Sequence, residues 1–324
     1  SRPAEYHVKD GKTIIDHCLF ANDSLLLRLE DGDLSLKTAQ ELKQSEVPTK
    51  KDSKTSEIAV WDEVYYKRSE PNVVLFDVGR YSLDGTTYSN REYGLEMNRQ
   101  LSGILNVTYS DAQPYIFRDS REAHMVYVRY EFDSEAELDG LLLAAERMEE
   151  CRVYLNGVPA DGVIMGYYVD ESIRTVRIPG VRKGRNILDI KLPFSAAGMI
   201  EPCYLLGEFD VTLRGCNPTI HQPSDRIGFG PLATQGMPFY GGNITYSTEI
   251  DTTEGTVRIT VNDFGAPCVR VFIDGEDAGL IAFAPFAVEK ELSEGRHRID
   301  FLCYGNRNNT FGPVHNKRMN DMDY

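Results

Sequence analysis

The sequence has little of what most catalytic and metal-binding motifs require. Its 324 residues include six cysteines, six histidines and one tryptophan, and no two cysteines form a Cys-x-x-Cys pair. No histidines have the His-x-His or His-Glu-x-x-His spacing of zinc sites, and no Gly-x-Ser-x-Gly surrounds a serine. These absences argue against zinc centres, dithiol redox chemistry and α/β-hydrolase chemistry.

Long hydrophobic runs and a surplus of positive charge are also missing. No stretch of about 20 apolar residues occurs, so membrane insertion is not expected. The formal net charge is -15 at pH 7, and DNA, RNA and anionic membranes would repel such a chain. The chain begins with Ser1 and has no signal-peptide pattern. We therefore expect a piece of a longer polypeptide, with the cytoplasmic and secreted compartments both left open.

What the sequence does contain is an internal repeat. Arg152–Gly157 recurs as Arg270–Gly275, and Gly184–Ile190 recurs as Gly295–Phe301. Each copy has strand-like segments, a hairpin turn at Asn-Gly or Asp-Gly, and a strand opened by Gly-Arg. Strands at this spacing are typical of a β-sandwich or jelly roll. The predicted fold is all-β: tandem jelly-roll β-sandwiches with one short helix and an N-terminal partial β segment.

Three parts are expected along the chain. Residues 1–57 form the tail of a preceding β domain followed by a polar linker, with a hairpin at Asp10-Gly11. Residues 58–214 form the first jelly roll, and 215–324 form a connector and the second jelly roll. The predicted strands of the second copy are 243–251, 256–262, 268–274, 286–292 and 296–304.

The single expected helix covers residues 90–105. Its apolar face is predicted to contain Leu95, Met97, Leu101 and Leu105.

The cysteines are expected to be thiols rather than disulfides. Cys151, Cys268 and Cys303 lie within or beside apolar strand runs, where a buried thiol behaves as a small hydrophobic group. The even count permits disulfides, but the repeat does not preserve a pairing pattern. The compartment therefore stays open.

Several segments occur in an order shared with a known family. They are Glu70–Val73 through Asp84-Gly85, Gly166–Asp170, Tyr204–Phe209, Gln235–Gly242 and Arg307–His315. Together they resemble the C-terminal galactose-binding-like β-sandwiches, of the glycoside hydrolase family 2 sugar-binding type, of large bacterial glycoside hydrolases, some of them α-L-rhamnosidase-like. The resemblance covers roughly residues 58–316.

This resemblance implies a bacterial, non-catalytic accessory region that binds carbohydrate or braces a catalytic domain elsewhere in the same polypeptide. Two alternatives stay open: a purely structural interdomain scaffold, and a β-scaffold enzyme acting on polysaccharide. Glycoside hydrolysis needs two carboxylates flanking one bond. The chain has 50 acidic residues, so pairs such as Glu149-Glu150 arise by chance, and no catalytic residue is assigned.

A sugar site needs aromatic faces for stacking and planar polar groups for the hydroxyls. Two segments have this mixture, one in the loop after the first Asn-Gly hairpin and one formed by the connector and the C-terminal segment. The candidate residues are Tyr167, Tyr168 and Asp170 in the first, and Phe239, Tyr240, Arg307, Asn308, Asn309 and His315 in the second.

Each candidate also has a structural interpretation, which is favoured at any single position. Phe239 and Tyr240 would plug the end of a sandwich, and Asp170 would pair with Arg174. The Arg-Asn-Asn phrase would satisfy loop backbone groups. His297 is expected to face solvent. Trp61 is expected in a core or between domains.

No cofactor is predicted. Structural calcium is compatible with jelly-roll loops, where carboxylate and carbonyl oxygens would bind it. Asp161, Asp263 and Asp274 are available, but they show no ligand spacing, so no site is assigned.

Overall fold

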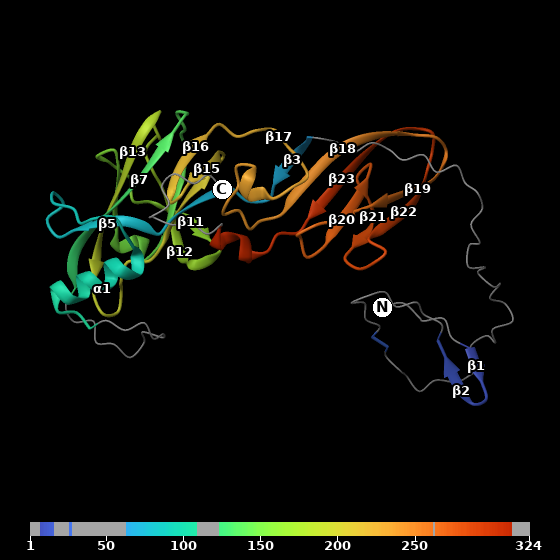
Figure 1. Cartoon of the computed structure of the whole chain (residues 1–324), viewed down its shortest axis with the longest axis horizontal. Coiled ribbons are helices and arrows are strands. Elements are labelled where there is room, and N and C mark those ends of the chain that lie inside the picture. The colour runs from blue at the N-terminus through green and yellow to red at the C-terminus, as the bar shows by residue number, and fades with distance from the viewer. Residues whose placement is uncertain (1–6, 16–25, 28–62, 109–122, 262, 313–324) are drawn as a thin grey trace. The chain divides into compact units, whose positions relative to one another are not determined.

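The computed structural model describes residues 7–15, 26–27, 63–108, 123–261 and 263–312 (Figure 1). Its contacts divide the chain into two units. The expected boundaries near residues 57 and 214 stay predictions, and Trp61 lies outside the described residues. The larger unit comprises Asp62–Thr248, Gly265–Pro267 and Phe301–Tyr324; the smaller comprises Ser1–Trp61, Glu249–Phe264 and Cys268–Asp300.

The N-terminal hairpin forms where the sequence predicts it. Strands β1 (His7–Lys9) and β2 (Lys12–Ile14) pair antiparallel. Asp10 and Gly11 between them have φ of 54° and 72°, the left-handed conformation that a two-residue type I′ turn requires.

The larger unit contains a β-sandwich of two sheets. One sheet has the order β10-β9-β13-β7-β16-β15, with β5 paired to β7 and β6 paired to β5; the other has the order β11-β12-β8-β14-β4. Buried and less buried positions alternate along β7 and β13, as expected for strands with one face in a core. The strands are β4 (Asn72–Phe76), β5 (Val78–Ser82), β6 (Glu92–Tyr93), β7 (His124–Ser134), β8 (Leu142–Glu146), β9 (Arg152–Leu155), β10 (Val158–Pro159), β11 (Ile164–Tyr168), β12 (Asp170–Arg177), β13 (Gly184–Phe194), β14 (Cys203–Gly207), β15 (Asp210–Arg214) and β16 (Asn217–His221).

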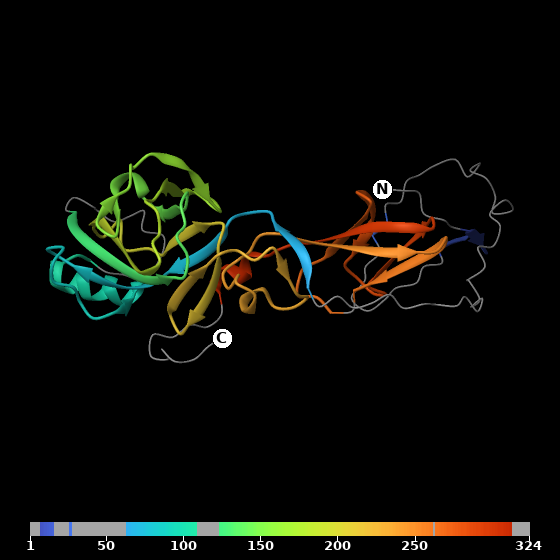
Figure 2. The same ribbon diagram turned by 90° about the horizontal axis from the view of Figure 1, so that it is seen from above.

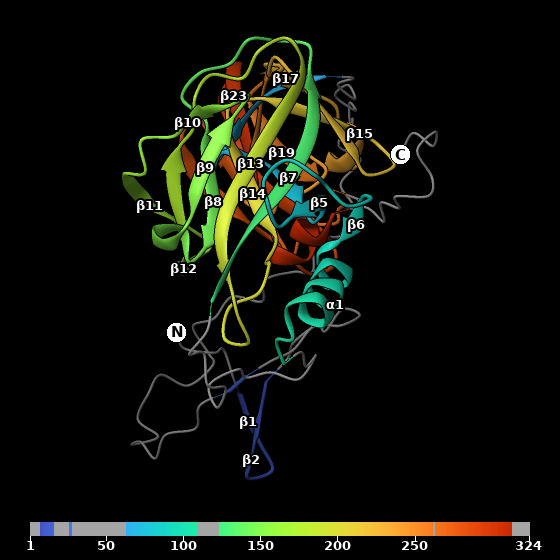
Figure 3. The ribbon, with the colours of Figure 1, turned by 90° about the vertical axis from the view of Figure 1, so that its left-hand side faces the viewer.

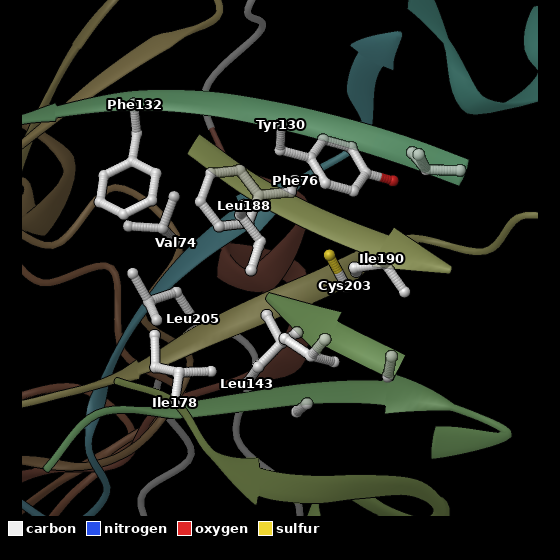
Figure 4. Packing of buried hydrophobic residues seen from close by; sticks show 14 of the residues in the cluster. Val74, Phe76, Tyr130, Phe132, Leu143, Ile178, Leu188, Ile190, Cys203 and Leu205 are labelled. Carbon is white, nitrogen blue, oxygen red and sulfur yellow. The ribbon is translucent and has the colours of Figure 1, made fainter. Parts of the chain in front are cut away.

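The core lies between these two sheets, which curve around a common interior (green to yellow in Figure 2). Phe76 stacks on Tyr130 with ring centroids 5.4 Å apart. Each fully buried large apolar side chain contributes about 1.5–3 kcal/mol. Figure 4 shows this packing for Val74, Phe76, Tyr130, Phe132, Leu143, Ile178, Leu188, Ile190, Cys203 and Leu205.

Helix α1 (Gly94–Leu105) confirms the expected helix, although it begins four residues later. Met97 and Leu101 are buried, and Asn106 ends the helix in the left-handed conformation. The predicted position of Leu95 on the apolar face is wrong, because its side chain is 74% exposed. Residues two apart, such as Leu95 and Met97, lie on opposite sides of a helix.

The second set of strands also forms largely as predicted. A six-stranded sheet has the order β17-β3-β18-β23-β20-β21, and β19 pairs with β22. All five strands expected in the second copy are present, while β21 was not predicted. The strands are β3 (Val64–Arg68), β17 (Arg226–Ile227), β18 (Ile244–Thr252), β19 (Gly255–Thr260), β20 (Val269–Ile273), β21 (Glu276–Ile281), β22 (Ala287–Leu292) and β23 (Gly295–Cys303); the 3-10 turns are η1 (Met148–Glu150), η2 (Leu232–Thr234) and η3 (Arg307–Phe311).

The sequence repeat corresponds to a repeated turn. Asn156 and Asp274 have φ of 52° and 51°, and the glycine after each has φ of 79° and 83°. The Asn156 side chain accepts a hydrogen bond from the amide of Ile187 at 3.0 Å, and Asp274 accepts one from Arg298 at 2.9 Å. The repeated residues therefore fix one hairpin to the neighbouring strand in both copies.

The expectation that His297 faces solvent is wrong. The residue is only 9% exposed, with Nδ1 2.6 Å from a carboxylate oxygen of Asp274 and Nε2 3.0 Å from the carbonyl oxygen of Ser293. Both acceptors lack hydrogens, so both ring nitrogens donate. These bonds raise the pKa of His297, the one to Asp274 most.

The described cysteines agree with the prediction of thiols. None of Cys151, Cys203, Cys216, Cys268 and Cys303 is in a disulfide.

Candidate functional site

The structure places Tyr168 of the first predicted sugar-binding segment near Tyr240 and Arg307 of the second, and the latter two side chains stabilise a turn. The Tyr240 hydroxyl accepts hydrogen bonds from the amides of Ser69 at 3.0 Å and Glu70 at 3.3 Å, and donates to the carbonyl of Asn243 at 2.9 Å. Arg307 forms a bidentate pair with the Glu70 carboxylate, at 3.0 and 2.8 Å. Both side chains thus secure the turn between β3 and β4.

The aromatic faces of this group are covered by protein. Tyr240 and Phe239 are each 1% exposed, and Phe239 belongs to the core of the larger unit. Tyr168 is buried and packs on Tyr204 with centroids 5.2 Å apart; burial raises the pKa of Tyr168 to about 12. A sugar could stack on these rings only after the packing was rearranged.

The remaining candidates are exposed or lie outside the described residues. Tyr167 is 57% exposed, and Asn309 is also exposed. The expected pair between Asp170 and Arg174 is wrong. Asp170 instead accepts hydrogen bonds from the amide and hydroxyl of Ser172, at 2.8 and 2.7 Å. The side chain of Asn308 and all of His315 lie outside the described part.

A cavity of about 220 Å³ lies at one end of the sandwich of the larger unit and includes none of these candidates. Strands from both sheets and the loop from β13 to β14 form its walls. Its lining residues are Val128, Tyr130, Ala145, Glu146, Arg147, Cys151, Ile190, Leu192, Pro193, Ala197, Gly198, Met199, Ile200, Glu201 and Cys203.

Helix α1 holds one wall of the cavity in place. The buried side chain of Asn98 donates to the carbonyl of Ile200 and accepts from its amide, both at 2.9 Å. Figure 3 shows the helix beside the yellow loop that joins β13 to β14. Two bonds to one backbone unit fix both the position and the orientation of this loop.

Arg147 and Gly198 form the rim. Arg147 has φ of 53°, an uncommon conformation for a residue with a side chain. Its guanidinium pairs with Glu150 through Nε at 3.0 Å and Nη2 at 2.8 Å. Nη1 lies so close to Gly198 that a side chain there would occupy its place. Gly198 is therefore required for Arg147 to reach over the β13–β14 loop.

The floor of the cavity is apolar, and its two thiols are unreactive. Val128, Ile190 and Met199 supply aliphatic surface. Burial raises the pKa of Cys151 to about 11 and that of Cys203 further. Such thiols are protonated at neutral pH, so neither is an activated nucleophile.

Two carboxylates, Glu146 and Glu201, face the cavity together. Burial raises the pKa of Glu201 above its ordinary value of 4.5, and the negative charge of Glu146 raises it further. Sequence reasoning missed this pair because Glu146 ends β8, Glu201 lies in the loop just before β14, and neither lies in a motif. Only the pairing of β8 with β14 brings them to the same end of the sandwich.

Within the described residues, no group of three His, Cys, Asp or Glu side chains could hold a metal ion. Asp161 accepts a hydrogen bond from the amide of Val163, and Asp274 is bonded to His297. Calcium binding stays a prediction without an assigned site. No helix among the described residues is long and apolar enough to span a membrane.

Comparison with known proteins gives distant likenesses. No family model and no curated protein matches the chain. Similar solved structures include a rhamnosidase from Novosphingobium sp. PP1Y, with 14% identity, a TM-score of 0.24, and coverage of 66% of this chain and 22% of that one. A family 2 β-galacturonidase from Eisenbergiella tayi, bound to galacturonate, has 10% identity, a TM-score of 0.26, and coverage of 73% and 37%.

A third similar structure is not a hydrolase by its description. An anti-sigma factor domain-containing protein from Clostridium clariflavum has 9% identity, a TM-score of 0.22, and coverage of 71% of this chain and 89% of that one. The chain spans well under half of either glycoside hydrolase. TM-scores this low support no conclusion about function.

Proposed function

We propose that this chain is a non-catalytic accessory region of a bacterial glycoside hydrolase and that it binds carbohydrate in the cavity at the end of the larger unit's sandwich. One observation carries the proposal: this cavity combines an aliphatic floor with Glu146, Arg147 and Glu201. A binding site of this kind is concave and mostly apolar, with a few polar groups that set orientation.

The chemistry of the lining suits a sugar. Carboxylate oxygens accept hydrogen bonds from hydroxyl groups, and a guanidinium donates to them. Among the described residues, no hydrogen bond or ion pair joins the Glu201 or Glu146 carboxylate to a protein partner. Both are therefore available to a ligand, while the floor can receive the C–H face of a pyranose ring.

The experiment is a calorimetric titration of the chain with neutral monosaccharides, such as D-glucose, D-galactose and L-rhamnose, and with their oligomers. Binding by the wild type that is weakened by Arg147→Ala supports the proposal. Lys183→Ala, in an exposed turn away from the cavity lining, is the control. Absence of binding to every sugar would contradict it.

A scaffold role is the second candidate, and an exposed apolar row on the edge strand β11 favours it. Met165 and Tyr167 on β11 are each about half exposed, as are Val163 and Val169 just before and after the strand. A row of this kind is typical of a surface that another domain covers. In this alternative, replacing Met165 and Tyr167 with serine would weaken attachment to the catalytic domain without changing sugar titrations.

An enzymatic role would use Glu146 and Glu201 as the carboxylate pair. It predicts hydrolysis of aryl glycosides that Glu201→Gln abolishes. The proposed function predicts binding of the same compounds with no release of the aryl group.

A further inference from the structure

The charge balance of the cavity indicates which sugars it accepts. Its charged lining consists of Glu146, Arg147 and Glu201. Glu150 lies just outside and pairs with Arg147, with Nη2 of the guanidinium 2.8 Å from its carboxylate. Three carboxylates and one guanidinium leave two net negative charges around a small space.

The one positive charge is already matched. Arg147 makes two hydrogen bonds to Glu150 and one long contact, 3.5 Å, to the carbonyl of Pro193. A bidentate guanidinium–carboxylate pair has little attraction left for a second anion. A ligand carboxylate at this rim would have to displace Glu150 or remain beside it.

The two negative charges are not matched. Glu201 is half-buried, and no ion pair joins it or Glu146 to a lysine or arginine within the described residues. The like charge of Glu146, which ends the strand next to β14 in the same sheet, acts on Glu201. A cation between the two carboxylates would relieve this repulsion, whereas an anionic ligand would increase it.

We infer that the cavity selects sugars that carry a protonated amine over neutral sugars, and rejects uronic acids. This inference rests on the proposed carbohydrate-binding function and names the ligand class for the same site. The ammonium group would lie between Glu146 and Glu201, and the C–H face of the ring would lie on the aliphatic floor.

The test compares sugars that share a ring and differ in charge. D-glucosamine, D-glucose and D-glucuronate, and the matching galactose series, are titrated into the chain near neutral pH and low salt. We expect the amino sugar to bind about tenfold more tightly than the neutral sugar, and the uronate to bind more weakly than both. The ratio of amino to neutral sugar should decrease with added salt.

Two acid-to-amide variants locate the effect. Glu201→Gln keeps the shape of the side chain and removes its charge. The ratio of amino-sugar affinity to neutral-sugar affinity should therefore fall toward one. Glu149→Gln is the matched control, because Glu149 is exposed and does not line the cavity; the preference should stay as in the wild type. Thermal melts check that both variants fold.

Each outcome has a distinct meaning. Equal binding of glucosamine and glucose overturns the amine selectivity and leaves the proposed function standing. Tightest binding by glucuronate also overturns it, since Arg147 would then dominate. Binding by no sugar contradicts the proposed function itself. An amine preference that survives Glu201→Gln would show that the ammonium lies elsewhere.

Discussion

The imidazole of His297 lies 2.6 Å from the carboxylate of Asp274, where the first copy of the repeat has two amides instead. In that copy, Nδ2 of Asn156 donates to Oδ1 of Asn186 at 2.9 Å. Both pairs fasten a type I′ turn to the next strand. The neutral Asn156–Asn186 pair does not titrate over the physiological pH range, whereas the ionic Asp274–His297 pair does.

Stability of the smaller unit should therefore depend on pH through this pair. The hydrogen bond to Asp274 raises the pKa of His297 above 6.5, so its contribution is complete below pH 6.5 and is lost as the pH rises through the raised pKa. The hydrogen bond from His297 lowers the pKa of Asp274 below 3.8, so its contribution is complete above pH 3.8 and is lost on acidification. Urea unfolding at a series of pH values should show the pair adding most to the free energy of unfolding between pH 3.8 and pH 6.5.

The double variant Asp274→Asn, His297→Asn supplies the control for this prediction. It copies the amide pair of the first repeat, so the turn should persist while the pH dependence from this pair disappears. An identical pH profile in the wild type and the double variant would contradict the account.

Tyr240→Phe should destabilise the larger unit by about 1–3 kcal/mol. The change keeps the buried ring but removes a hydroxyl that serves Ser69, Glu70 and Asn243. Tyr167→Phe is the matched control: its side chain is exposed, and its loss should stay within about 0.5 kcal/mol. Chemical denaturation measures both. Equal losses of stability in the two variants would mean that the hydrogen bonds of the Tyr240 hydroxyl do not stabilise the larger unit.

Asn98→Ala should reduce the stability of the larger unit by about 2–4 kcal/mol, since a buried backbone amide or carbonyl without a partner costs about 1–3 kcal/mol. It should also weaken sugar binding, because Asn98 fixes the cavity wall through Ile200. Ile104→Ala, on the exposed side of the same helix, should change neither. Full sugar affinity in folded Asn98→Ala would show that α1 does not position the site.

Gly198→Ala should weaken sugar binding about tenfold while changing stability by no more than about 1 kcal/mol. The added methyl group would occupy the place of Arg147 Nη1, and the end of that side chain can move. Gly103→Ala is the glycine control: a methyl group there meets nothing within 4 Å, so it should stabilise the helix by about 0.4–1 kcal/mol. Unchanged sugar affinity in Gly198→Ala would show that Arg147 does not contribute to sugar binding.

The sequence predicted much of the fold because local patterns encode it. Alternating apolar residues located most strands, and Asn156-Gly157 and Asp274-Gly275 located two turns. The burial of His297 was missed because its partner Asp274 is distant in sequence. Strand β21 was missed because Glu276–Ile281 has few apolar residues on an edge of the sheet.

The candidate site was less accessible to sequence reasoning. Composition identified segments rich in aromatic and polar residues, but burial placed Phe239 and Tyr240 in the interior. The cavity depends instead on Glu146, Arg147 and Glu201, which come together through strand pairing and one glycine contact. Nothing in their local sequence distinguishes them from other charged residues.

The most direct test of the central claim is a methyl NMR titration of the chain with D-glucosamine and D-glucose. Met199, Ile190 and Ile200 line the cavity, whereas Met165 reports on the edge strand beside Tyr167. The account predicts saturable shifts at the three cavity methyl groups, reached at lower concentration with glucosamine, and none at Met165. Shifts at Met165 with the cavity signals unmoved would contradict it, as would no shift at any methyl group.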